Sequence, residues 1–105
     1  MFFGDYQKYP NAKVNGSLLW EYNMDKVDYS KMRNLIVARV IERRWPQDWY
    51  AIFNLYGVSG VISAVKEIPY MNDKDMNFVA YIFNLPLTAL QCYTNRQLAR
   101  KHWNS

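Results

Sequence analysis

The sequence predicts an all-α fold, a compact orthogonal bundle of four to five short helices with an irregular N-terminal arm. From residue 28 onward, apolar residues recur at three- and four-residue steps, which is the spacing of one helix face. Prolines, glycines and capping residues interrupt this spacing, so several short helices are favoured over one long bundle. A strand-like stretch at residues 18–22 has no second such stretch with which to pair.

The composition supports one folded domain. The chain has 105 residues, of which 50% are hydrophobic and 17% are aromatic. Large aromatic side chains bury much apolar area per residue, so a chain of this length can form a single core. We expect three segments: an irregular N-terminal arm over residues 1–27, a helical domain over residues 28–93 and a basic C-terminal tail over residues 94–105.

The arm and the first helix meet near Asp28. The arm has no sustained period, although residues 18–22 are apolar enough to lie on the rest of the domain. Asp28 or Ser30 can cap the first helix. The helix should end around Arg43 and Arg44, since cations favour the negative end of the helix dipole. Its apolar stripe consists of Met32, Leu35, Ile36, Val40 and Ile41.

Two more helices follow within residues 46–69. Pro46 can start the second helix because the first helical position needs no N–H donor. Gly57 is a natural left-handed stop for it. A third helix can then begin at Ser59 and end before Pro69. The inward residues of these two helices are Trp49, Ile52, Phe53, Tyr56, Val61, Ile62 and Val65, with Ile68 as a further candidate.

The fourth helix begins with a recognisable cap. Asn72 followed by Asp75 resembles a capping box, and Leu85–Pro86 stops the helix. Thr88 can cap a last turn that reaches Tyr93, and the basic tail beyond it can be helical. The stripe of the fourth helix is Met76, Val79, Ile82 and Phe83. The apolar residues that the tail has to bury are Leu98, Ala99 and Trp103.

The formal charge of +4 is concentrated in two places. Residues 28–44 contain five cations against two acids, and residues 94–105 contain three cations and no acid. Two basic segments are compatible with an anionic partner, but the charge is small beside that of dedicated nucleic-acid binders.

Cysteine usage and the first residues favour a cytoplasmic protein. Cys92 is the only cysteine, so an intrachain disulfide is impossible and a reducing compartment is expected. The first ten residues do not resemble a signal peptide, and no apolar stretch reaches the length of a membrane span. We expect no membrane partner.

The residue types needed for most catalysis are scarce. With only His102 and Cys92, neither a usual zinc site nor a serine or cysteine triad can be assembled. No glycine-rich phosphate loop occurs. Asp73 and Asp75 stand at a helix start, where they suit the dipole. We therefore expect no enzyme activity, no catalytic or metal-binding residue and no cofactor.

A helix-turn-helix fits the pattern poorly. With Gly57 in the turn and residues 59–67 as reading helix, Ser63 and Lys66 occupy positions that need apolar side chains. With residues 72–83 as reading helix, acidic side chains lead, which opposes contact with phosphate. A protein-interaction surface is the other option, built from aromatic residues that fall off the stripes. These are Trp20, Tyr22, Trp45, Tyr50, Tyr70 and Trp103.

A specific order of motifs runs through the chain: LLWEYNMDKVDYSKMRNLIVARVIERR, DWYAIFNLYGVSGVISAVKE, NDKDMNFVAYIFNLP and then Cys92. Together they resemble a small bacterial family of unknown function that is common in Bacteroides-like organisms, and the likeness covers residues 18–103. The chain departs from the family pattern with Glu21 in place of aspartate and Gln91 in place of arginine, so the roles of those two positions stay open.

The resemblance implies a partner but no chemistry. Family members are often encoded beside nucleotidyltransferase-type toxins of the abortive-infection class, which implies an antitoxin or accessory partner. We therefore predict a non-enzymatic protein-interaction or antitoxin-like partner of such a toxin. The alternative is a DNA-binding transcriptional regulator of its own operon, and either role is compatible with a homo-oligomer.

The candidate surface for a protein partner or nucleic acid combines the basic segments with neighbouring aromatics. It comprises Arg33, Arg43, Arg44, Trp45, Tyr50, Arg96, Arg100 and Lys101. Within residues 42–57, we expect four side chains to be free to contact a partner: Arg43, Arg44, Trp45 and Tyr50.

Overall fold

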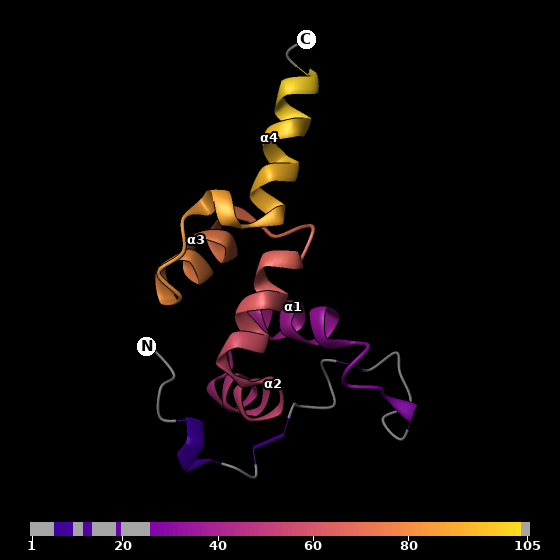
Figure 1. Ribbon diagram of the computed structural model, residues 1–105, viewed down its shortest axis with the longest axis vertical. Coiled ribbons are helices and arrows are strands. Elements are labelled where there is room, and N and C mark those ends of the chain that lie inside the picture. The colour runs from indigo at the N-terminus through magenta and orange to yellow at the C-terminus, as the bar shows by residue number, and fades with distance from the viewer. Residues whose placement is uncertain (1–5, 10–11, 14–18, 20–25, 104–105) are drawn as a thin grey trace.

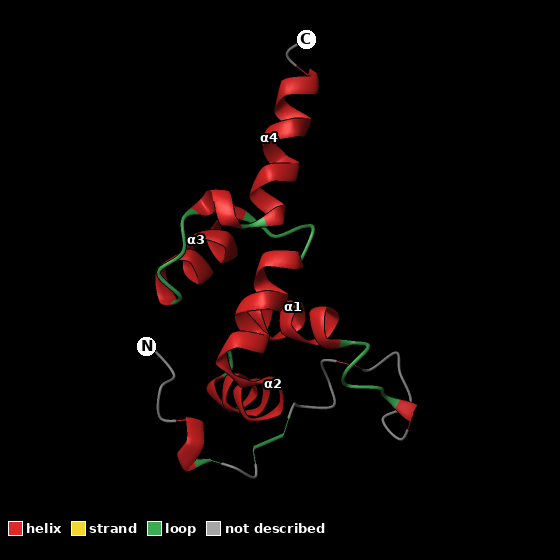
Figure 2. Cartoon of the chain, in the orientation of Figure 1, coloured by secondary structure: helices red, strands yellow, loops and turns green. Residues whose placement is uncertain are grey.

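The computed structural model describes residues 6–9, 12–13, 19 and 26–103, with side chains as far as Ala99. The described part contains helices, turns and loops and no strand, so the predicted all-α class is confirmed (Figure 2). The elements in order are the 3₁₀ helix η1 (Tyr6–Lys8), α1 (Arg33–Arg43), α2 (Pro46–Glu67), α3 (Asp73–Ile82), the 3₁₀ helix η4 (Leu87–Ala89) and α4 (Gln91–Trp103).

Helix α2 is the centre of the arrangement. It is the longest helix, and α1 packs mainly against it. Figure 1 shows the first half of α2 nearly end-on and its second half rising toward α3 and α4. Helix α4 then extends beyond the other helices, away from η1.

Helix α2 contains both the second and the third predicted helix. Gly57 interrupts it with φ 74° and ψ 166°, a conformation outside the helical region. That region is open essentially to glycine alone, so the predicted break at Gly57 is confirmed. The expected stop was a left-handed helical residue, but the ψ value here is extended. Helical backbone resumes directly after Gly57, so the two halves form one bent helix.

The core joins the arm, α1, both halves of α2, and α3. Aromatic side chains dominate the contact between α2 and the α3 segment: the Trp49 ring centroid lies 5.9 Å from that of Phe78 and 6.3 Å from that of Phe83. The largest fully buried side chains are Trp49, Phe53, Leu19, Ile36, Ile41, Ile52, Leu90, Val37, Val40, Val61, Val65 and Val79. Most residues of the predicted stripes of α1 to α3 therefore face the core. Leu35 and Ile62 are exceptions, because both are only partly buried and lie outside the core cluster, whereas Val37 and Ala64 belong to it.

Local capping follows the sequence. The Asn72 side chain accepts a hydrogen bond from the Asp75 main-chain N–H at 2.7 Å, which confirms the predicted cap of α3. Asp28 accepts one from the Lys31 main-chain N–H at 3.1 Å, but it closes a turn ahead of α1 rather than the helix itself. Helix α1 therefore begins later than expected, at Arg33.

The described part of the arm is fastened to α2 through main-chain carbonyls. The Asn54 side-chain N–H group donates to the carbonyl oxygens of Tyr6 at 3.1 Å and Tyr9 at 2.9 Å. Leu19 is fully buried, as expected for an apolar stretch lying on the domain. The rest of residues 18–22, including Trp20, lies outside the described residues.

The C-terminal region differs from expectation in two ways. Residues 91–103 form one helix, α4, so the expected boundary at residue 94 falls inside it. Leu98 was expected to be buried, but it is 60% exposed because α4 projects beyond its neighbours (Figure 1). Of the helices in the described part of the chain, none is both long and apolar enough to cross a membrane.

Candidate functional site

Three of the predicted surface arginines are engaged within the chain. The Arg33 guanidinium lies 2.7 Å from the Glu67 carboxylate, and the Asn34 amide donates to the same oxygen at 3.0 Å. This contact ties the start of α1 to the end of α2. It is an exposed ion pair, so it contributes little to stability.

Arg44 was predicted to be free, and this is wrong. It ends α1 in the left-handed region with φ 61°, and its guanidinium lies 2.6 Å from the Asp75 carboxylate. The same guanidinium stacks over the Phe78 ring, 4.4 Å from its centroid. The Asp75 side chain is only 7% exposed. Arg44 therefore neutralises a buried carboxylate at the start of α3 and is not available to a partner.

Arg96 anchors α4. Its guanidinium forms an ion pair with Asp73 and donates to the Met71 carbonyl oxygen at 3.0 Å. The side-chain amide of the preceding residue, Asn95, donates to the Pro69 carbonyl oxygen at 3.0 Å. These polar contacts thus hold helix α4 against the 68–72 loop.

The two aromatic residues predicted for the partner surface, Tyr50 and Trp45, differ in their surroundings. Tyr50 stacks on Tyr9 with ring centroids 4.5 Å apart, so the arm uses this ring and the prediction that it is free is wrong. Trp45 is exposed, with the Arg43 guanidinium 5.2 Å from its ring centroid. Arg43 and Trp45 are therefore solvent-accessible, as expected. Arg100 and Lys101 lie in α4, but their side chains are outside the described part.

The structure brings together a different set of residues in an open groove of about 540 Å³. The end of α1, the 68–72 loop and α4 form its walls. The lining residues are Glu42, Tyr70, Met71, Asn72, Cys92, Asn95, Arg96 and Ala99. A smaller hollow of about 40 Å³ adjoins it and shares Glu42 and residues 70–72. The groove thus contains one predicted surface residue, Arg96, and one predicted interaction aromatic, Tyr70.

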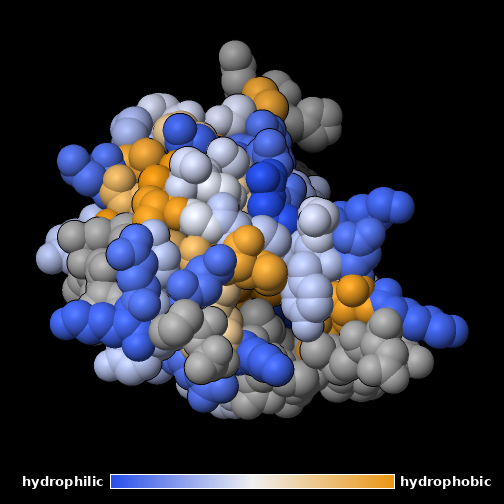
Figure 3. Space-filling model, turned by 60° about the horizontal axis from the view of Figure 1, so that its bottom comes forward, coloured by the Kyte–Doolittle hydropathy of each residue, from blue (hydrophilic) through white to orange (hydrophobic). Residues whose placement is uncertain are grey.

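The groove lining includes an unusually exposed aromatic side chain. Tyr70 is 82% exposed. On the face shown in Figure 3, hydrophobic residues occur in separate small areas between hydrophilic ones. Because these areas are scattered, apolar surface alone does not locate a binding site on this face. A large exposed side chain beside a hollow is a more specific sign of binding.

The charges of the groove are unevenly matched. Arg96 and Asp73 pair with each other, whereas the Glu42 side chain makes no hydrogen bond or ion pair with another described residue. Cys92 lines the floor and is 3% exposed. Burial raises the pKa of its thiol, an effect that nearby main-chain hydrogen bonds only partly offset. The thiol is therefore protonated at neutral pH and a poor nucleophile.

The described residues contain no cluster of three or more histidine, cysteine or acidic side chains that could hold a metal ion. The groove thus offers one carboxylate, two amides, a paired arginine, a protonated thiol and apolar surface. Such a set can bind a segment of another molecule by shape and charge.

Comparison with known proteins gives one family. Residues 14–65 match the model of a family described as "Family of unknown function (DUF6922)". The expected resemblance to a family of unknown function is confirmed for these residues, which span α1 and α2 as far as Val65. Neither a curated protein nor a solved structure matches the chain significantly.

Most of the groove was not foreseen from the sequence. Tyr70 could be found because it falls off every helical stripe. Glu42 had the signal of an anion in the last turn of a helix, where the dipole disfavours it. The lining by Met71, Asn95 and Ala99 depends on how α4 is seated, and no local pattern carries that information.

Proposed function

We propose that this chain is a non-enzymatic protein-interaction module whose partner binds in the groove beside α4. The observation that carries the proposal is the open groove with highly exposed Tyr70 at its edge. Large aromatic side chains at the margin of a hollow are the usual anchors of protein interfaces. The protonated thiol of Cys92 agrees with a binding role rather than a nucleophilic one.

The proposed partner is a nucleotidyltransferase-type toxin, for which the chain acts as an antitoxin-like protein. Support for this partner comes from the sequence resemblance described above. The compact α1–α2 unit and the projecting α4 suit a protein that presents a fixed surface to a larger one.

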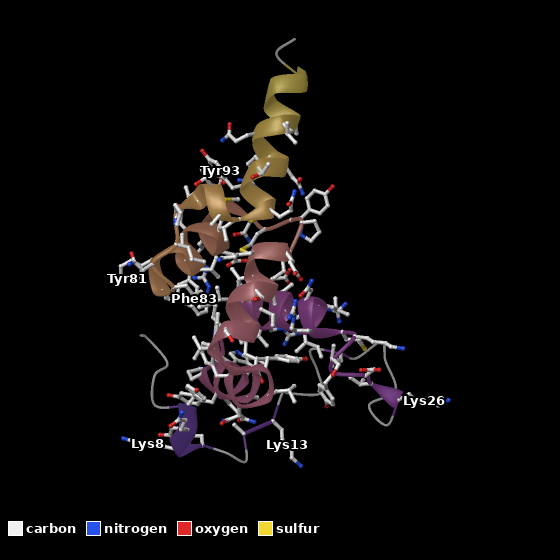
Figure 4. All side chains as sticks on the ribbon, in the orientation of Figure 1. Lys8, Lys13, Lys26, Tyr81, Phe83 and Tyr93 are labelled. Carbon is white, nitrogen blue, oxygen red and sulfur yellow. The ribbon has the colours of Figure 1, made fainter. Side chains whose placement is uncertain are left out.

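Co-purification with the neighbouring gene product tests the proposal. We expect a complex that persists at micromolar concentration and weakens about tenfold or more when Tyr70→Ala is introduced, as for an aromatic hot spot. Tyr81→Ala is the matched control, because Tyr81 is 77% exposed but points away from α3 outside the groove lining (Figure 4). Absence of a complex, or equal weakening by both variants, would contradict the proposal.

DNA binding is the weaker alternative. Of the cations expected to contact phosphate, Arg33, Arg44 and Arg96 each pair with a carboxylate of the chain itself. Phosphate would have to displace those carboxylates, which reduces the electrostatic gain. A gel shift with steep salt dependence on the upstream region would favour this alternative instead.

A further inference from the structure

We propose that Glu42 selects the partner segment, which presents a lysine or arginine to it beside an apolar side chain that enters the groove. This inference rests on the proposed function, because it names the chemistry of what binds in the same groove. The carboxylates in and near the groove differ in their partners. Asp75 lines the smaller hollow and pairs with Arg44, and Asp73 pairs with Arg96 of the groove lining, whereas Glu42 lines both hollows and its side chain has no such pair among the described residues.

The position of Glu42 does not serve the fold. It lies in the last turn of α1, where the negative end of the helix dipole disfavours an anion. Its side chain is exposed, so it contributes no core packing. A residue that breaks a local rule without a structural gain is a candidate for a binding role.

A segment lying in the groove would remove water from Glu42. A carboxylate that loses water without gaining a cation is strongly disfavoured. The occupant must therefore carry a cation at this point, and acidic segments are rejected by repulsion. Phosphate is rejected for the same reason, so a polypeptide fits the groove better than nucleic acid.

The apolar residues of the groove lining determine the second feature of the occupant, which is its apolar side chain. Met71, Cys92 and Ala99 present apolar surface next to Glu42, with Tyr70 at the edge. A segment that pairs with Glu42 therefore gains most by placing an apolar side chain against these residues.

Selection from a displayed library of random 12-residue peptides tests this chemistry without the natural partner. Peptides are selected on the full chain, and those that also bind Ala99→Arg are discarded, since that variant fills the groove from an exposed position. We expect the retained peptides to contain lysine or arginine next to an apolar residue. Their affinity should fall tenfold or more with Glu42→Lys and less with Glu42→Gln.

A charge-swapped peptide completes the test. Replacing the peptide's cation with glutamate should restore binding to Glu42→Lys. Glu67→Lys is the matched control, because it makes the same charge change at an exposed site outside the groove; it should leave affinity unchanged. Retained peptides without a cation, full binding by Glu42→Lys, or no peptide that distinguishes Ala99→Arg would each overturn the inference.

The two proposals can fail separately. A toxin complex that forms but is indifferent to Glu42→Lys would overturn the recognition chemistry and leave the interaction role intact. Peptides that depend on Glu42, together with no toxin complex, would support the groove chemistry and overturn the proposed partner.

Discussion

Helices α1 and α4 are held in the molecule by different forces. Helix α1 buries Ile36, Val37, Val40 and Ile41 against α2 and the arm. Among the described side chains of α4, only Cys92 is buried, and hydrogen bonds from Asn95 and Arg96 to loop carbonyls provide its seat. Apolar burial stabilises far more than exposed polar contacts. We infer that packing between α1 and α2 provides most of the stability of the fold. Helix α4 forms one wall of the groove and contributes little to that stability.

The largest effect should come from the α1–α2 side. Trp49→Ala empties the centre of the aromatic cluster and should reduce the free energy of unfolding by about 3–5 kcal/mol. Leu98→Ala, at an exposed site in α4, should change it by less than about 0.5 kcal/mol. Urea unfolding followed by circular dichroism measures both. Similar losses for the two variants would contradict the inference that α1 and α2, rather than α4, carry the stability.

The second effect concerns the contact between α1 and α3. Arg44→Ala leaves the Asp75 carboxylate buried without its cation, and we expect a loss of about 2–3 kcal/mol, below the range for fully buried pairs because Arg44 is partly exposed. The double variant Arg44→Ala with Asp75→Ala should be more stable than the sum of the single losses implies. Additive losses in this cycle would show that the pair is not coupled.

A smaller effect should appear at high pH. The Tyr56 hydroxyl donates to the Tyr29 carbonyl oxygen at 2.7 Å, and burial, with a smaller contribution from Tyr29, raises the pKa of Tyr56 to about 12. Because the folded pKa lies above the ordinary value of 10.0, the stabilisation is complete below pH 10 and is lost as pH rises toward 12.

Tyr56→Phe should therefore cost about 0.5–1.5 kcal/mol at neutral pH through the lost hydrogen bond. It should also flatten the fall in stability between about pH 10 and pH 12. Chemical unfolding across this range compares the two proteins. An equal slope for both would contradict the assignment of that pH dependence to Tyr56.

The smallest global effect should come from α4 itself. Arg96→Ala removes an exposed ion pair and one hydrogen bond to the loop, so the free energy of unfolding should change by about 1 kcal/mol or less. Hydrogen exchange should nevertheless accelerate in α4 while α1 stays protected. Accelerated exchange throughout the chain would instead make α4 part of the same cooperative unit.

The sequence predicted those parts of the fold that depend on near neighbours. Asn72 caps α3 by accepting a hydrogen bond from Asp75, which is only three residues away. Gly57 interrupts α2 through its own backbone conformation. The core stripes follow from the three- and four-residue spacing. Each of these signals can be read within a few residues of the chain.

The parts that were missed depend on distant partners. Arg44 and Asp75 are 31 positions apart, and Arg33 and Glu67 are 34 apart, so their pairing could not be read from spacing. For this reason Arg33 was assigned to the partner surface and Arg44 was expected to be free. The groove was missed for the same reason, because its walls come from α1, a loop and α4. Leu98 was misplaced because a helical pattern does not show whether anything packs against the helix.

The bend at Gly57 also determines where the second half of α2 packs. A straight helix of the 22 residues in α2 would be about 33 Å long, given a rise of about 1.5 Å per residue. The principal extents of the chain are 50 × 31 × 19 Å, so an unbent α2 would exceed two of them. Because the helix turns at Gly57, its second half returns Val61, Ala64 and Val65 to the core. A single residue without a side chain thus lets both halves of one long helix pack on the same core.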